Sequence, residues 1–515
     1  MKPTVFTDVS SSLISVLGIS MGDEGKGRVV HEILEEIHNT TGKHAAGVIK
    51  INGGANAGHT AAGLKLNLLP SGVSNPNVSL LLVASGVVAD PRKFLWEAKP
   101  LEFRGLSVIE RLLIDEKCQV SDISHRLLDL AWENYRVKKL GLESRGSTGR
   151  GISPAYNDET GQWQIFYQCF LQDRKIFAKK LKQRLERALK TIQFVCEVED
   201  KDWYDFFSTL SDAEIKANKT SIEENIFPEE EFSFHRFMGK EPYTLDFDAI
   251  ESTYWESGTK LINCIRDSRE ELLDCIHNQR VVVAEFGQAY WLDKRHGFSP
   301  NVTASHTTGN ELFSSAGIPI QNMTQVACCK AYDTKVGTHH FITKLDHKED
   351  PWGEKLAKLE FGTSTGRQRM VGWFDSVEKG NALRYGGFDE LVINKLDALS
   401  VDEFVDQNLM ICTAYKMPDG TTTKKVPRDE SIRRQLAPVY EVFTGWTDDL
   451  QKVSHYDELP EEAKIYFSRM VSSLVEVAYP EGWLNRKLPK IRFIGVGPDP
   501  GQIIRDIPPI EAFLE

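Results

Sequence analysis

Residues 13–37 decide the fold, and they read LISVLGISMGDEGKGRVVHEILEEI. The apolar stretch 13–19 predicts a buried strand, and the glycine-rich stretch 20–27 predicts a tight loop. Apolar residues then recur at the spacing of one helix face, namely Val29, Val30, Ile33, Leu34 and Ile37. The segment therefore predicts strand, loop and helix in succession, with free backbone N–H groups at the helix N-terminus that favour a bound phosphate.

The same alternation recurs along the chain and predicts an α/β fold. Short apolar runs ending in polar, glycine-bearing loops occupy residues 47–51, 80–88, 279–285, 325–332, 390–396 and 491–496. We expect a large, mostly parallel central sheet flanked by helices, similar to P-loop NTPases, with ligands at the loops that follow the strands. No linker is visible, so residues 1–515 are treated as one domain. Within it, residues 175–260 predict either a helical subdomain or insertion, or a solvated charged face.

Composition narrows the class of protein. The chain has 515 residues, of which 41% are hydrophobic, and a formal net charge of -12. This charge argues against a general nucleic-acid binder, whose affinity comes from clustered Lys and Arg. The apolar runs are shorter than the roughly 20 residues of a membrane helix, and the start lacks the features of a secretion signal. Eight cysteines without a CxxC pair suggest reduced thiols. We expect a cytoplasmic enzyme that does not bind membranes.

The loop Gly22-Asp23-Glu24-Gly25-Lys26-Gly27-Arg28 is the first candidate site. Lys26 adds a positive charge to the loop amides, although the loop lacks the first glycine and the Ser or Thr of a Walker A motif. A carboxylate among phosphate-binding amides, here Asp23, can bind magnesium or remove a proton from a ligand. The alternative is a glycine-rich turn that carries surface charges.

Four further loops have the composition of a ligand site. Residues 56–60 offer His59 among small residues, and residues 146–151 offer hydroxyls and amides. Residues 362–369 add two arginines, whose guanidinium forks pair with carboxylates or phosphates. Asn394-Lys395-Leu396-Asp397 matches the NKxD pattern of guanine-binding proteins. An aspartate there accepts hydrogen bonds from guanine N1–H and the 2-amino group, which adenine does not offer. Each loop alone is also compatible with plain surface structure.

Together these loops resemble the adenylosuccinate synthetase family, in order along most of the chain. The matching strings are GDEGKG (22–27), GGANAGHT (53–60), LLPSG (68–72), STGRGISPAY (147–156), GQAYWLD (287–293), KAYDTKVG (330–337), GTSTGRQR (362–369), GWFD (372–375), NKLD (394–397), PVYEVFTGW (438–446) and GVGPD (495–499). The resemblance implies a GTP-dependent ligase of purine biosynthesis. Such an enzyme joins L-aspartate to carbon 6 of IMP through a 6-phosphoryl intermediate and releases adenylosuccinate, GDP and phosphate.

The resemblance also implies roles for individual residues. Asp23 would be the general base, His59 its acid partner and Lys26 a third catalytic group, with Mg²⁺ held by Asp23 and the carbonyl of Gly58. The IMP-binding set would be Asp23, Glu24, Lys26, Asn56, His59, Thr148, Gln288, Thr303 and Arg367. The aspartate-binding set would be Thr363, Ser364, Thr365, Arg367 and Arg369. The GTP-binding set would be Gly22, Gly25, Lys26, Gly27, Arg28, Gly58, Thr60, Arg369, Lys395, Asp397, Gly495 and Gly497.

Some positions depart from the family and leave alternatives open. Family members form homodimers, in which an arginine reaches across to the nucleotide phosphate; Gln162 stands at that position here. A second hypothesis is a divergent synthetase acting on a 2-aminopurine nucleotide such as dGMP. Phage relatives of that kind typically lose the aspartate that this chain retains as Asp23, which favours IMP. A third hypothesis is a non-catalytic sensor of purine nucleotides.

Overall fold

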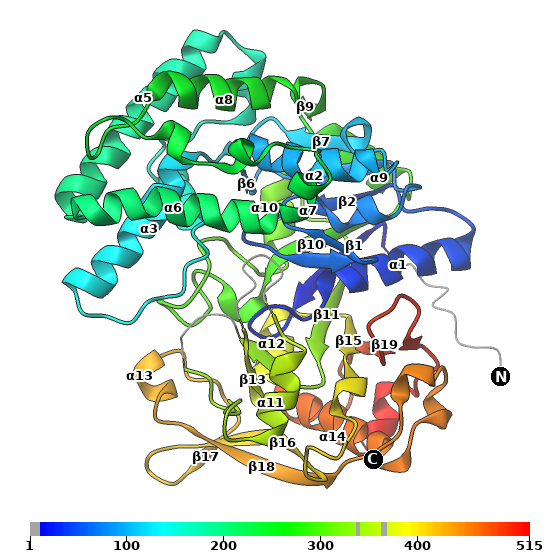
Figure 1. Cartoon of the computed structure of the whole chain (residues 1–515). Coiled ribbons are helices and arrows are strands. Elements are labelled where there is room, and N and C mark those ends of the chain that lie inside the picture. Colours follow the sequence, from blue (N-terminus) through cyan, green and yellow to red (C-terminus); the bar gives the residue numbers. More distant parts are fainter. Residues whose placement is uncertain (1–10, 336–339, 362–367, 515) are drawn as a thin grey trace.

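A ten-stranded sheet runs through the molecule and carries helices on both faces (Figure 1). The computed structural model describes residues 11–335, 340–361 and 368–514. From one edge to the other, the strands are β20 (Ile503–Ile504), β19 (Lys490–Gly495), β15 (Glu390–Asn394), β11 (Thr324–Lys330), β1 (Leu13–Gly18), β10 (Val282–Ala289), β2 (Gly47–Lys50), β5 (Leu80–Val83), β7 (Leu112–Asp115) and β9 (Ile265–Arg266). All neighbouring pairs are parallel except β19 and β20 at one edge. The predicted α/β fold, similar to P-loop NTPases, is confirmed.

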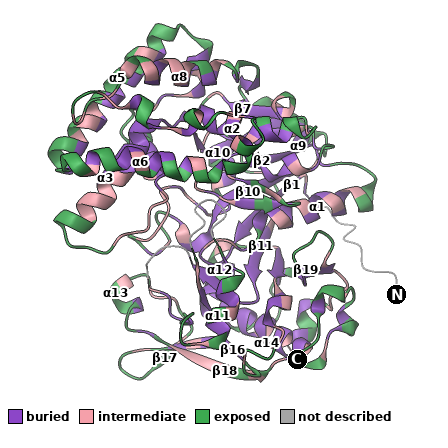
Figure 2. Cartoon of the chain, in the orientation of Figure 1, coloured by how far each residue is buried: buried purple, intermediate pink, exposed green. Residues whose placement is uncertain are grey.

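Alternate residues of the central strands enter two separate hydrophobic cores. In β1, Leu13 and Leu17 pack into one core, whereas Ile14 and Val16 pack into the other. This is the period of two that a strand imposes on its side chains, and it explains why parallel strands covered on both faces are apolar throughout. Figure 2 shows the resulting buried centre beneath an exposed outer layer of helices.

Fourteen α-helices are assigned within the described ranges. They are α1 (Lys26–Thr41), α2 (Pro91–Phe103), α3 (Ile123–Asn134), α4 (Ile152–Thr160), α5 (Arg174–Lys190), α6 (Asp200–Ala217), α7 (Lys219–Glu223), α8 (Phe247–Thr259), α9 (Arg269–His277), α10 (Glu311–Ala316), α11 (Pro351–Lys358), α12 (Ser376–Gly386), α13 (Glu430–Arg433) and α14 (Glu461–Ala478). None of them combines the length and apolar character needed to cross a bilayer.

The smaller sheets lie at the ends of the central strands and in the lower lobe of Figure 1. They pair β3 (His59–Ala61) with β4 (Leu64–Leu66), β6 (Val88–Ala89) with β8 (Gln119–Val120), and β12 (Asp333–Lys335) with β13 (Met370–Gly372). A fourth sheet contains β14 (Phe374–Asp375), β16 (Asn408–Lys416), β17 (Thr422–Thr423) and β18 (Ala437–Thr444).

Residues 80–88 do not form the single strand that their apolar character suggests. Strand β5 ends at Val83, and β6 begins only at Val88. Between them Gly86 passes so close to its neighbours that a Cβ there would lie 2.5 Å from Oγ of Ser315 and 2.9 Å from the carbonyl oxygen of Ile51. The chain therefore turns away from the sheet at the carboxyl ends of β2 and β5.

Residues 175–260 contain α5 from its second residue, together with α6, α7 and α8. Their inward side chains, among them Phe177, Trp203 and Tyr254, are buried in the second of the two cores. Their outward faces are exposed and charged (Figure 2). The segment is thus a group of helices with one apolar and one solvated side. All eight cysteines of the chain are free and buried.

Candidate active site

The loop between β1 and α1 takes a backbone path that few residues tolerate. Gly22, Asp23 and Gly25 have φ angles of 104°, 71° and 84°, in the left-handed region. Glycine adopts this region readily, and aspartate is one of the few other residues that visit it. The loop therefore turns sharply before α1 begins at Lys26, which leaves the first amides of the helix free to face a ligand.

The side chain of Glu24 holds this loop from inside. One carboxylate oxygen accepts hydrogen bonds from the amides of Ser20 (3.3 Å) and Gly22 (2.9 Å). The other oxygen pairs with the ammonium group of Lys26 at 2.9 Å. Glu24 lines the cavity, as expected, but its carboxylate is fully engaged in shaping the loop. A Cβ on Gly18 would lie 2.2 Å from this carboxylate, which explains the glycine at the end of β1.

His59 starts β3 and lies against the end of β10. Its Nδ1 contacts Oε1 of Glu285, whose carboxylate also accepts hydrogen bonds from the amide (2.8 Å) and hydroxyl (2.7 Å) of Ser71. Burial lowers the pKa of His59 well below its usual value, and the nearby charges of Lys50 and Lys26 lower it further. Nε2 of His59 has no hydrogen-bond partner among the described residues.

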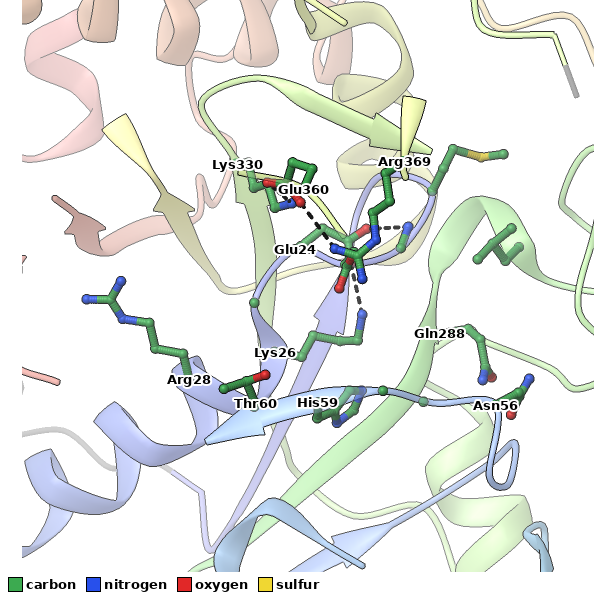
Figure 3. Close-up of a pocket in the computed structure, with 18 of the residues that line it drawn as sticks. Glu24, Lys26, Arg28, Asn56, His59, Thr60, Gln288, Lys330, Glu360 and Arg369 are labelled. Carbon is green, nitrogen blue, oxygen red and sulfur yellow. Dashed lines mark hydrogen bonds and ion pairs between the residues drawn. The ribbon is translucent and has the colours of Figure 1, made fainter. Parts of the chain in front are cut away.

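Arg369 directly precedes β13, and its side chain contacts the loop between β1 and α1, the phosphate loop (residues 19–25). Its guanidinium contacts the carboxylate of Asp23 and lies 3.1 Å from Glu360. Burial lowers the pKa of Arg369 to about 10, so the group stays charged at neutral pH. Burial alone would raise the pKa of Glu360, but Lys330 and Lys395 lower it to about 2. Figure 3 shows this cluster of opposite charges beside Glu24 and Lys26.

The loop after β15 supplies the groups of the NKxD string. Asn394 donates a hydrogen bond from Nδ2 to the carbonyl oxygen of Glu24 at 2.8 Å, which ties this loop to the phosphate loop. Lys395 has a φ angle of 62° and pairs with Glu360 at 2.7 Å. Burial raises the pKa of Asp397 above its usual value, and its Oδ1 atom is buried without a hydrogen-bond partner in the described part of the chain.

All of these loops open into one cavity of about 650 Å³. Figure 3 shows Arg28 on one side, Asn56 and Gln288 on the other, and Lys26 and His59 between them. The predicted site residues that line it are Gly22, Asp23, Glu24, Gly25, Lys26, Gly27, Arg28, Asn56, Gly58, His59, Thr60, Thr148, Gln288, Thr303, Arg369, Lys395, Asp397 and Gly497. Four loops far apart in the sequence, together with Arg369, thus converge on one cavity.

The remaining predicted residues do not line the cavity or lie outside the described residues. Gly495 does not line the cavity; it is buried at the end of β19, where a Cβ would lie 2.8 Å from Oδ1 of Asn394. Its closeness to the NKxD loop is therefore a matter of packing. Thr363, Ser364, Thr365 and Arg367 lie outside the described residues.

Among the lining or contacting residues that were not predicted from the sequence are Glu285, Lys330 and Glu360. Their side chains pair with His59, Lys395 or each other. Glu285 lies two residues before the recognised string GQAYWLD, and Lys330 is the first residue of KAYDTKVG, which is the only signal that could have indicated them.

Comparison with known proteins agrees with this geometry over nearly the whole chain. The family model for adenylosuccinate synthetase matches residues 15–227 and 216–504. The adenylosuccinate synthetase of Clostridium botulinum (strain Alaska E43 / Type E3) is 32% identical over 500 residues, which cover 96% of this chain and 99% of the relative. The chain belongs to the adenylosuccinate synthetase family.

Other adenylosuccinate synthetases agree with this membership. The enzyme of Vibrio parahaemolyticus (serotype O3:K6) is 31% identical over 509 residues, with 97% of this chain and 99% of the relative covered. A fully ligated adenylosuccinate synthetase from Plasmodium falciparum superposes with a TM-score of 0.75 at 25% identity and covers 96% of this chain and 99% of that one. The succinoaminodeoxyadenylate synthetase of cyanophage S-2L, solved with dGMP and dATP, has a TM-score of 0.50 at 14% identity and covers 98% of both chains; it supports the fold alone.

Proposed function

We propose that this adenylosuccinate synthetase-family ligase joins the amino group of L-aspartate to carbon 6 of IMP and consumes GTP. The products are adenylosuccinate, GDP and phosphate. The observation that carries the proposal is the set of buried, unpartnered polar atoms on the wall of one cavity: Nε2 of His59, Nε2 of Gln288 and Oδ1 of Asp397, each without a hydrogen-bond partner among the described residues. Such groups are costly to bury unless a ligand completes their hydrogen bonds.

Asp23 and His59 have separate roles in the proposed reaction. Oxygen 6 of IMP is a poor leaving group, so GTP first phosphorylates it, and the amine of aspartate then displaces phosphate. Asp23 takes the proton from N1 of the purine, which makes O6 more nucleophilic. His59 stabilises the charge that develops near O6; negative charge on the transferred phosphoryl group raises its proton affinity and offsets the effect of Lys50 and Lys26.

The end of the cavity near Asp397 suits guanine. An aspartate can accept hydrogen bonds from guanine N1–H and the 2-amino group together, and the buried Oδ1 atom has its acceptor capacity unused. Adenine offers neither donor, so the buried carboxylate would be left unpaired. Arg28 orders the neighbouring loop because its guanidinium donates to the carbonyl oxygens of Gly497 and Gln502, the latter at 2.9 Å.

The residues present fit a Mg²⁺ ion bound together with substrate phosphates. Magnesium is usually held by only one or two carboxylates and completed by phosphates and water. Asp23 and Gly58 line the same cavity, and the left-handed backbone at Asp23 places a carboxylate within the phosphate loop. Asp23 and the carbonyl of Gly58 would hold the ion, which supplies positive charge for phosphoryl transfer. Residues 363–369, with Arg369 at the described end, are proposed to bind L-aspartate.

A divergent synthetase that uses a 2-aminopurine nucleotide such as dGMP is the second candidate. A phage enzyme solved with dGMP has a similar fold, and this similarity concerns the fold alone. The presence of Asp23 favours IMP, because phage relatives that act on dGMP typically lose this aspartate. A sensor that binds purine nucleotides without turnover is the third candidate. By family resemblance we also expect a homodimer located in the cytoplasm.

One experiment separates the three candidates. Purified protein is mixed with GTP, Mg²⁺ and L-aspartate, and either IMP or dGMP is added while the ultraviolet absorbance of the succinylated product is followed. The proposal expects turnover with IMP. Turnover with dGMP but not IMP would establish the second candidate, and nucleotide binding without turnover would establish the third.

A further inference from the structure

The wall of the cavity around Thr148 includes an arginine that sequence reasoning did not place in the site. Arg145 lines the same cavity as Asn56, Thr148, Gln288 and Thr303, which are among the residues proposed to hold IMP, and it lies three residues before Thr148 in the same loop. Its side chain is 30% exposed, so the guanidinium is accessible to a ligand in the cavity. The loop that carries it, residues 144–151, has no regular secondary structure.

Two carboxylates on one face of α3 hold this loop. Glu133 accepts hydrogen bonds from the amide and Nε of Arg145, both at 3.0 Å. One turn earlier, Asp129 accepts from the hydroxyl of Ser147 (2.7 Å) and the amide of Gly151 (3.0 Å). Because residues four apart on a helix lie on the same face, Asp129 and Glu133 together hold both ends of the loop. Arg145 is thereby held at Nε, and its two Nη atoms make no hydrogen bond to any described residue.

The distribution of positive charge in the cavity singles out this residue. Among the other lysines and arginines of the described lining, Lys26, Lys330, Lys395 and Arg369 pair with carboxylates of the phosphate loop or with Glu360, and Arg28 donates to backbone carbonyl oxygens. Arg145 also pairs with a carboxylate, that of Glu133, but only through Nε, and it is the one Lys or Arg that the loop of residues 144–151 contributes to the described lining. A nucleoside 5′-monophosphate bound beside this loop would place a group of nearly two negative charges in a wall that also contains the carboxylate of Asp129, so a cation is needed there.

We propose that Arg145 binds the 5′-phosphate of the acceptor nucleotide from within the same subunit. This inference rests on the proposed function, because it assumes that the acceptor is a nucleoside monophosphate. The two free Nη atoms form the fork that pairs with phosphate oxygens, and Glu133 orients the fork in advance. The residue makes the enzyme select nucleotides over nucleosides at this subsite.

Gln162 does not supply an alternative cation. It follows the end of α4 with a φ angle of 61°, is exposed, and is absent from the cavity lining. Its amide is also uncharged. Position 162 therefore offers no positive charge to a phosphate.

The test compares binding of IMP and of inosine, which lacks the phosphate, to the wild type and to three variants by isothermal titration. Arg145→Gln is expected to weaken IMP binding about 10- to 100-fold, the usual range for charge-assisted hydrogen bonds, and to leave inosine and GTP binding within about twofold. Arg145→Lys should recover part of the loss, because it restores charge without the fork. Arg136→Gln is the matched control: this arginine lies in the π-helical turn Tyr135–Lys139 that follows α3, donates to the carbonyl oxygen of Glu143, and is not part of the lining.

The outcomes are distinguishable. Unchanged IMP binding by Arg145→Gln overturns the assignment of Arg145 while the proposed function stands. An equal loss for IMP and inosine also overturns it, because the residue would then support the pocket as a whole. Failure of the wild type to bind IMP, with dGMP or no nucleotide bound instead, refutes the proposed function. Thermal unfolding of each variant confirms that the fold is retained.

Discussion

Replacing Asp23 by asparagine tests the base without disturbing the loop that carries it. Asparagine, like aspartate, tolerates the left-handed conformation at this residue, whereas alanine would add backbone strain of about 1 kcal/mol. The substitution removes the negative charge and keeps the shape. Asp23→Asn therefore isolates the proton acceptor from the geometry of the phosphate loop.

The structure sets the expected size of the effects on stability and on rate. Asp23 is partly exposed and pairs with Arg369, which keeps its second contact to Glu360, so the free energy of unfolding should change by less than about 1 kcal/mol. Loss of a general base lowers kcat about 100- to 10,000-fold, or about 2.7 to 5.4 kcal/mol in activation free energy. Rate and stability should thus respond very differently.

The assay follows adenylosuccinate formation at saturating Mg²⁺, with GTP binding measured separately by titration. GTP binding should stay largely intact in Asp23→Asn, and the melting temperature should stay within about 2 °C of the wild type. Asp419→Asn, in an exposed turn where the carboxylate accepts from the amide of Thr421, serves as the matched control and should have the wild-type rate. A wild-type rate in Asp23→Asn would remove this carboxylate from the mechanism.

Three further predictions concern the guanine site, a buried carboxyl and the metal. Asp397→Asn should raise KM for GTP about 100-fold and improve use of xanthosine triphosphate, whose 2-oxo group accepts from the new amide; equal KM values for GTP in both proteins would contradict the guanine contact. Burial raises the pKa of Glu311 to about 7, so the folded state binds an extra proton between about pH 4.5 and 7 and loses stability as pH rises through 7. Glu311→Gln should therefore gain on the order of 1–2 kcal/mol at pH 8, allowing for its partial exposure, and far less at pH 5; parallel urea-unfolding profiles at the two pH values would refute this. Excess EDTA should abolish turnover and added Mg²⁺ should restore it, and an undiminished rate in EDTA would exclude the metal from the reaction.

Local sequence carried enough information to predict the first strand, loop and helix. The apolar run of β1, the glycines of the phosphate loop and the helical spacing after Lys26 are all local signals, and the structure reproduces them. The prediction that residues 80–88 form one strand was wrong, because the turn depends on the close approach of Gly86 to α10, which is a tertiary contact. Apolar character alone cannot report such a contact.

The candidate site divides in the same way. Asp23, His59 and Asp397 were indicated by the strings that contain them, and the topology brings their loops to one cavity. Glu285 was missed because its partnership with His59 depends on the pairing of strands that are distant in the sequence. Arg145 was missed for a related reason, because its position on the cavity wall depends on the hydrogen bond from its Nε to Glu133 of α3.

The most direct test of the central claim uses IMP labelled with ¹⁸O at position 6. If GTP phosphorylates O6 before aspartate displaces it, the phosphate released should carry one ¹⁸O for each adenylosuccinate formed, as measured by mass spectrometry. Release of unlabelled phosphate during adenylosuccinate formation would contradict the 6-phosphoryl route. Absence of any product from IMP would contradict the ligase function itself.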